Sequence, residues 1–182
     1  MGNESSSPAF RYRKELLKLS WRLVLTVQEQ AASHQASRAQ SHTSDLNATK
    51  ADGKSALSIS LVAGKEGIKP FHEDFEASFF KYCPDLKTKF PSNYSLVSKM
   101  IQSFISNAIE CKDISKLARN FGKSHKQHQL TNEHFEGFAS ALVDTIQSRL
   151  GKFGTIELVK IWREVTVGLV KAMQKEYKKA TK

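Results

Sequence analysis

Hydrophobic residues recur at helical spacing early in the chain, and then the pattern stops. The stripe within residues 11–28 consists of Leu16, Leu19, Leu23 and Val27. Residues three or four apart share one face of a helix, so this segment is predicted to be the first helix. Residues 29–67 are instead rich in Ala, Ser, Gln, Thr, Asn and Gly. Such a composition buries little apolar surface, and we expect these residues to form a flexible insertion.

The helical pattern resumes at about residue 68. Phe71, Phe75 and Phe79 lie four residues apart and predict a helix. It should end at Cys83-Pro84, because proline and the residue before it both disfavour a continuing helix. The clearest apolar stripe follows and comprises Leu96, Val97, Met100, Ile101, Phe104, Ile105, Ala108 and Ile109. It predicts a helix that is buried over much of its circumference.

Capping residues divide the rest of the chain into three more helices. Asp113 is a suitable N-cap for the first of them. Either Thr131 or Asn132 begins the second, and Gly151 stops it. The last helix begins near Thr155. The stripes of these last two helices contain Phe135, Phe138, Leu142, Ile146 and Leu150, then Leu158, Trp162, Leu169, Met173 and Tyr177.

These elements predict an all-α fold of about six to eight helices, with no credible sheet. Residues 11–28 would supply its first helix and residues 68–178 the remainder of the domain. Residues 1–10 form a tail at the start of the sequence, and residues 179–182 form a basic tail at its end.

Composition, cysteine count and net charge limit the classes of protein to which this chain can belong. The chain has 182 residues, 40% of them hydrophobic, and 11 are Phe, which is enough for a core. Two cysteines, Cys83 and Cys111, do not make a disulfide scaffold. Without a secretory signal pattern they indicate reduced thiols in a cytoplasmic protein. The net charge of +10 suits an acidic partner or an anionic membrane. Nucleic acid is not expected as a partner, because no recognition module is present.

The first residues fit a lipidation pattern. Met1-Gly2 is followed by Ser at the sixth position, as in N-myristoylation of Gly2. The alternative is a plain Ser-rich tail. One acyl chain binds membranes marginally, and a basic cluster is the usual second signal. Such a cluster follows, made of Arg11, Arg13, Lys14, Lys18 and Arg22. We therefore expect a cytoplasmic protein that is attached to a membrane through an acylated Gly2.

One histidine shares a helix face with two apolar anchors. Leu117, Phe121 and His125 lie four residues apart, so a single helix would direct all three side chains to one side. Neutral imidazole is the usual protein ligand of haem iron. A lone histidine on an apolar stripe is also commonly a satisfied interior or surface residue. The two interpretations stay open on this pattern alone.

The order of these features resembles the globin family, in an atypical neuroglobin- or cytoglobin-like form with a long insertion after the first helix. Pro84 and Phe90 resemble the globin corner whose Phe packs on the haem. The stretch from Leu117 to His125 is similar to the segment that ends in the proximal histidine, and Trp21 resembles the tryptophan of the first globin helix. The resemblance implies haem b as cofactor, His125 as the iron ligand, Phe90 against the macrocycle and Leu130 as an apolar haem contact.

The resemblance is less clear on the distal side. Counting back from His125 without gaps puts Leu96 at the distal position, Lys99 on the polar rim and Met100 on the inner wall. Phe104 and Phe138 would complete the apolar wall. The connection from Phe90 to Leu96 is short for the family, so either that corner is tight or the distal residue lies elsewhere. Glu76 aligns with a position that is usually apolar over the haem, where a buried carboxylate is costly unless protonated or paired.

The function expected from the resemblance is haem-based binding of a diatomic gas such as oxygen, or redox signalling or gas sensing with a redox partner. The alternative is a haem-free globin-like module that binds an acidic partner or anionic lipid. No paired carboxylates, nucleophile motif or phosphate loop was found, so the sequence predicts no enzyme.

Overall fold

The computed structural model describes residues 8–40, 69–111 and 113–182, and for residues 27–40 it describes the backbone alone. These parts form helices and no strand, which confirms the all-α prediction. The α-helices are α1 (Pro8–Gln40), α2 (Phe71–Tyr82), α3 (Tyr94–Glu110), α4 (Ile114–His125), α5 (Asn132–Leu150) and α6 (Ile156–Ala180). Short 3-10 turns are η2 (Pro84–Leu86), η3 (Lys126–His128) and η4 (Gly151–Phe153).

The first helix is longer than its hydrophobic pattern predicts. It runs to Gln40, whereas the apolar stripe ends near residue 28. Ala, Gln, Glu and Arg recur beyond that point, and these residues favour a helix without needing an apolar face. Part of the expected flexible insertion is therefore helical. Residues 41–67, the rest of that prediction, lie outside the described residues.

The predicted inner face of α1 is also wrong. Leu19 and Leu23 are 55% and 47% exposed. The buried face instead carries Leu17, Trp21 and Val24. The predicted face and the buried face have similar apolar spacing. The buried face turns inward because the Trp21 ring on it packs into the core.

The predicted start of α4 and both predicted ends of α5 are confirmed. The Asp113 side chain accepts a hydrogen bond from the Ser115 N–H at 2.9 Å, and Thr131 is the N-cap of α5. Gly151 ends α5 with a φ of 50°, a left-handed value that favours glycine.

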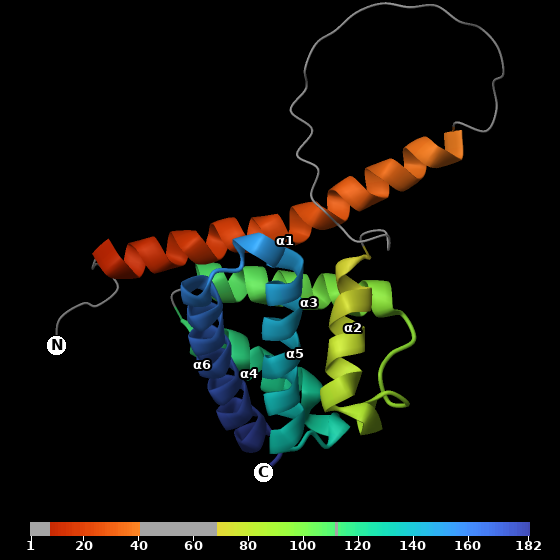
Figure 1. Cartoon of the computed structure of the whole chain (residues 1–182). Coiled ribbons are helices and arrows are strands. Elements are labelled where there is room, and N and C mark those ends of the chain that lie inside the picture. Colours follow the sequence, from red (N-terminus) through yellow and green to blue (C-terminus); the bar gives the residue numbers. More distant parts are fainter. Residues whose placement is uncertain (1–7, 41–68, 112) are drawn as a thin grey trace, which may run out of the picture.

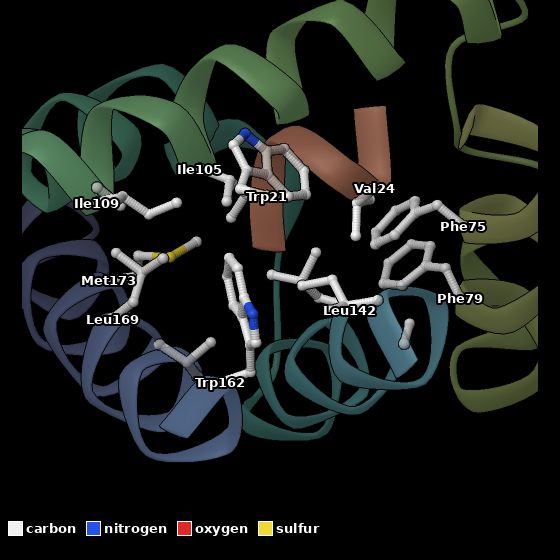
Figure 2. Close-up of a cluster of buried hydrophobic side chains, with 14 of the residues drawn as sticks. Trp21, Val24, Phe75, Phe79, Ile105, Ile109, Leu142, Trp162, Leu169 and Met173 are labelled. Atoms are coloured by element: carbon white, nitrogen blue, oxygen red, sulfur yellow. The ribbon is translucent and has the colours of Figure 1, made fainter. Parts of the chain in front are cut away.

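Two layers of helices enclose the core. The described part of α1 lies across α5 and α6 at one end of the molecule, with α3 beside it, and α4 lies behind α5 and α6 (Figure 1). Trp21 from α1 and Trp162 from α6 meet at the centre, with ring centroids 5.9 Å apart (Figure 2). Each indole N–H has a hydroxyl acceptor: Trp162 donates to Ser20 at 3.0 Å, and Trp21 donates to Ser106 at 2.8 Å. These bonds fix how α1, α3 and α6 meet.

Arg149 of α5 joins the two helices, α1 and α2, that come before and after the long insertion. Its buried guanidinium donates to the Val24 carbonyl of α1 at 3.2 Å and to the Lys69 carbonyl at 2.9 Å. It also donates to the Asp74 carboxylate of α2 at 2.6 Å. The side chain of Arg149 is 2% exposed, so its charge depends on these partners.

Replacing Asp74 with alanine should lower the free energy of unfolding by about 1–3 kcal/mol, because a buried cation loses its carboxylate. Urea denaturation measures the change. Glu73→Ala is the matched control, since Glu73 is the exposed neighbour and carries the same charge. Equal effects of the two substitutions would contradict the structural role of the Asp74–Arg149 pair.

Candidate functional site

His125 is the last residue of α4, and its ring is held in a defined orientation. Its Nδ1 lies 3.0 Å from the Phe121 carbonyl oxygen and 3.0 Å from the Ser124 hydroxyl oxygen. A carbonyl only accepts hydrogen bonds, so Nδ1 carries the proton. The lone pair of the neutral ring is therefore on Nε2.

The surroundings of His125 also keep its ring neutral. Burial lowers the pKa of His125, and the nearby His128 adds to this effect, while the Phe121 carbonyl opposes both. The imidazole stacks on the Phe121 ring with centroids 4.0 Å apart and planes 15° apart. A neutral, oriented imidazole with Nε2 available has the chemistry of a metal ligand.

Helix α4 is positioned by a close approach to α6. A Cβ atom on Gly122 would lie 2.8 Å from the backbone oxygen of Glu176 and 2.9 Å from the backbone nitrogen of Tyr177. No side chain fits there. The backbone of α4 therefore rests directly on α6, and this contact sets the position from which Phe121 and His125 project.

Aromatic side chains extend from the histidine into the core. Phe121 contacts Phe104 of α3 and Phe135 of α5, with centroid separations of 6.1 and 5.9 Å. Phe135 packs on Tyr177 of α6 at 5.5 Å. The Tyr177 hydroxyl accepts a hydrogen bond from the Leu130 backbone N–H at 2.9 Å. The structure thus brings two predicted cofactor contacts, Phe104 and Leu130, to the residues that support His125.

A second aromatic group surrounds Phe90. Its ring stacks on Tyr94 at 6.1 Å and meets the edge of Phe80 at 5.4 Å. Phe79 lies between Phe90 and Phe138, with centroids 5.7 and 6.5 Å away. Phe90 and Phe138, both predicted cofactor contacts, therefore belong to one aromatic cluster that α2 holds together.

A small hollow opens beside Phe90 between α2 and α3. Its lining consists of His72, Phe75, Glu76, Phe90, Tyr94, Val97, Ser98 and Ile101. We call it the α2–α3 hollow. Its walls are aromatic and aliphatic, and α2 contributes two ionisable side chains, His72 and Glu76.

Leu96, Lys99 and Met100 do not line this hollow. Leu96 and Met100 are 54% and 59% exposed, and Lys99 is exposed as well. Ser98 is buried instead, which sets the rotation of α3. Leu96, predicted at the distal position, and Met100, predicted on the inner wall, therefore lie outside this hollow. Val97 and Ile101, the next residues along the chain, line it instead.

The signal that sequence reasoning missed was Ser98. Helix α3 carries four serines, and Ser98 is the one that is buried. A buried small polar residue can mark the point where two helices approach closely. Glu76 was recognised as unusual, and the structure places it in the lining of the hollow. His72, one helical turn before Glu76, was not considered.

The other histidines near the site have different roles. His134 accepts a hydrogen bond from the Thr131 N–H at 3.0 Å through Nδ1. Its Nε2 therefore donates to the Asp85 carboxylate at 2.8 Å, at the start of α5. His128 is exposed. Among the side chains that the structure describes, no three His, Cys, Asp or Glu residues gather as a metal site.

Two further predictions concern membranes. Gly2 lies outside the described residues, so its acylation is not addressed by the structure. None of the described helices is long and apolar enough to cross a bilayer.

Comparison with known proteins agrees with this architecture. The model of the globin family matches residues 73–173. The chain is also 27% identical to the anaerobic nitrite reductase HBII of Casuarina glauca over 139 residues, which is 69% of this chain and 87% of that protein. The matched residues begin within α2, end within α6, and include Phe90 and His125. The chain belongs to the globin family.

Proposed function

We propose that the protein is a haem-binding globin in which His125 is the proximal ligand of haem b. The observation that carries this proposal is the hydrogen bonding of the imidazole. The Phe121 carbonyl and the Ser124 hydroxyl occupy Nδ1, which leaves Nε2 as the atom that can bind iron. Family membership supports haem-based gas binding, and the donor chemistry of this residue fits it.

Several apolar side chains would hold the macrocycle. Phe104 and Leu130 lie next to the residues that support His125, and Phe90 and Phe138 lie around α2. On α3 we assign the inner wall to Val97 and Ile101, in place of Leu96 and Met100. Lys99 is exposed, and we assign it to the polar rim, where its ammonium would pair a haem propionate.

Bound haem iron supplies reversible binding of a diatomic gas and exchange of one electron. The apolar residues named above would exclude water from the bound group, and His125 would hold its iron. We infer that the protein binds a gas such as oxygen, as a carrier, as a gas sensor or in redox signalling with a redox partner. The haem-free interaction module is disfavoured, because His125 keeps an orientation and a protonation state suited to a metal.

Nitrite reduction is a second candidate function. It follows from the printed name of the Casuarina relative rather than from a motif in this chain. Reduction of nitrite to nitric oxide and water consumes two protons, taken from solvent, and one electron. Ferrous haem would supply the electron. Anaerobic release of nitric oxide from nitrite and the reduced protein would support this function, and its absence would favour a role without catalysis.

Membrane attachment through an acylated Gly2 is a further part of the proposal. The exposed apolar residues Leu19 and Leu23 on α1 support it. The basic cluster contributes less than its charge suggests. Lys14 and Lys18 pair with Glu110 at 3.5 and 3.1 Å, and Arg13 pairs with Glu164. The acyl chain would therefore carry most of the membrane affinity.

His125→Ala should weaken haem binding by at least about tenfold, an effect typical even of losing a supporting partner of a metal ligand. Titration with haem, followed by the Soret band, measures this. His128→Ala is the control, because its exposed ring lies only 5.8 Å from that of His125. Equal haem affinity of the two variants would contradict the assignment.

Haem release from the wild-type protein on acidification should begin below pH 6.5, the ordinary pKa of imidazole, because burial lowers the pKa of His125. The loss of the Soret band during an acid titration measures this release.

Intact mass measurement of the protein from a eukaryotic host should show a myristoyl group on Gly2. The acylated protein should sediment with anionic vesicles, whereas Gly2→Ala should remain in the supernatant because it lacks the acceptor. An unmodified Gly2 in the wild-type protein would overturn this part of the proposal.

A further inference from the structure

Most of the net positive charge of the chain lies in two short segments. Residues 114–128 and 165–182 contain nine of the 28 basic residues and one of the 18 acidic residues, so they carry eight of the ten net positive charges. The remainder of the chain has 19 basic and 17 acidic residues and is nearly neutral. The nine basic side chains are all exposed: Lys116, Arg119, Lys123, Lys126, Lys171, Lys175, Lys178, Lys179 and Lys182.

The packing of α4 on α6 joins these side chains into one surface. The basic residues of the first segment recur three or four places apart, so they share one side of α4 and the turn that follows it. Glu176 of α6 marks where the two helices meet, because it pairs with Arg119 of α4 at 3.7 Å and with Lys179 of α6 at 2.7 Å. We call the surface formed by the nine side chains the α4–α6 basic face.

Most cations of this face have no acidic partner within the described part of the chain. Glu176 is the one acidic residue in the two segments, it is 8% exposed, and Arg119 and Lys179 already pair with it. The other seven basic side chains of the face form no ion pair there. They differ in this respect from Lys14 and Lys18 of α1, which pair with Glu110. Their charge is available to attract an anionic partner.

The face offers charge without an apolar anchor. Among the described residues, none of the large hydrophobic side chains that are exposed lies within 114–128 or 171–182. A contact of this kind cannot be held by burial of hydrocarbon. It suits brief encounters between proteins, in which small interfaces form quickly because opposite charges attract each other over a distance.

The position of the face also favours a protein over a membrane as its partner. Helix α1 lies across one end of the molecule, and α6 runs from there to the opposite end, where the chain terminates (Figure 1). Arg13 of α1 pairs with Glu164 of α6, whereas the basic residues of α6 begin at Lys171 and continue to its far end. A membrane contact through α1 therefore leaves the α6 part of the face away from the lipid.

The basic face adjoins the proposed iron ligand. Lys123 and Lys126 stand on either side of His125 in the sequence, at the end of α4. The His125 ring stacks on Phe121 of the same helix, with centroids 4.0 Å apart. A protein that binds this face lies against the helix that would hold the iron. The step from docking to electron transfer rests on the proposed function.

We propose that the α4–α6 basic face docks the acidic surface of an electron-donating protein. The unpaired lysines attract the donor and orient it against α4. The donor then loses one electron, and ferric iron held by His125 gains it and becomes ferrous. No covalent bond forms or breaks in this step.

The test uses plant-type ferredoxin, a small acidic one-electron donor. The face variant combines Lys116→Gln, Lys123→Gln, Lys175→Gln and Lys178→Gln. The control variant removes the same number of charges from exposed lysines outside the two segments, and combines Lys81→Gln, Lys87→Gln, Lys89→Gln and Lys160→Gln. A third variant changes the four lysines of the face variant to arginine, which keeps their charge. Thermal denaturation and the Soret band check that each variant is folded and binds haem.

Two readouts are measured at low ionic strength. Oxidised ferredoxin should bind the face variant at least about tenfold more weakly than the wild-type protein, and reduced ferredoxin should reduce it more slowly by a similar factor. The control and arginine variants should stay within about threefold of the wild type. High salt should remove most of the difference, because it screens the charges.

A cationic donor separates charge from damage to the haem site. Hexaammineruthenium(II) is repelled by the basic face, so it should reduce the face variant at least as fast as the wild-type protein. Slower reduction of the face variant by both donors would show a damaged site, and would overturn the proposal.

The remaining outcomes separate this proposal from the proposed function. Failure of the wild-type protein to bind haem overturns the proposed function and the electron transfer with it. Normal haem binding with equal losses in the face and control variants, or with ferredoxin binding unchanged in the face variant, overturns docking at this face alone. If the face variant instead loses only a salt-sensitive affinity for phosphatidylserine vesicles, the face binds lipid and the proposal is wrong. Weaker binding and slower reduction by ferredoxin, confined to the face variant, support it.

Discussion

The contact between α4 and α6 at Gly122 is the constraint on which the candidate site depends. A hydrogen in place of a side chain lets the backbone of α4 lie against the backbone of Glu176 and Tyr177. Across the same junction, the Glu176 carboxylate of α6 pairs with Arg119 of α4 at 3.7 Å, and it also pairs with Lys179 of its own helix at 2.7 Å. Because α6 is anchored in the core through Trp162, the close approach transmits the rigidity of the core to the helix that ends in His125. A metal ligand requires this kind of fixed support.

The two sides of the proposed haem site are built in different ways. On the side of α4, a backbone carbonyl, a serine hydroxyl and a stacked phenylalanine hold one imidazole in one tautomer. On the side of α2 and α3, the lining is mostly hydrocarbon, with Glu76 and His72 at its edge. The first arrangement suits the attachment of a metal, whereas the second supplies an apolar wall.

Surface charge has a more local role than the net charge of +10 suggests. The cations of α1 serve partly to attach that helix to its neighbours, since Lys14 and Lys18 reach Glu110 of α3 and Arg13 reaches Glu164 of α6. Charges committed to such pairs contribute little to the attraction of an anionic surface. A cluster of basic residues can thus either attract a membrane or attach a long helix to its neighbours. The positions of the acidic side chains show which basic residues are paired within the protein.

Local sequence was sufficient for the helix ends at Asp113, Thr131 and Gly151 and for placing Leu117, Phe121 and His125 on one helix. Asp113, Thr131 and Gly151 act through their own backbone neighbourhood, so their effects could be predicted from residue type. The spacing of Leu117, Phe121 and His125 likewise follows from the period of one helix. The continuation of α1 to Gln40 was missed, because its residues favour a helix without forming an apolar stripe.

The rotation of α1 and α3 about their axes required the tertiary structure. Adjacent pairs such as Leu96 and Val97, or Met100 and Ile101, satisfy helical spacing equally well. The choice between them depends on contacts with other helices, where Ser98 is buried and Trp21 finds Ser106 and Trp162. The same holds for Glu76, whose place in the hollow depends on the meeting of α2 and α3. Periodicity along one helix specifies which residues share a face, and only packing against the rest of the molecule specifies which face turns inward.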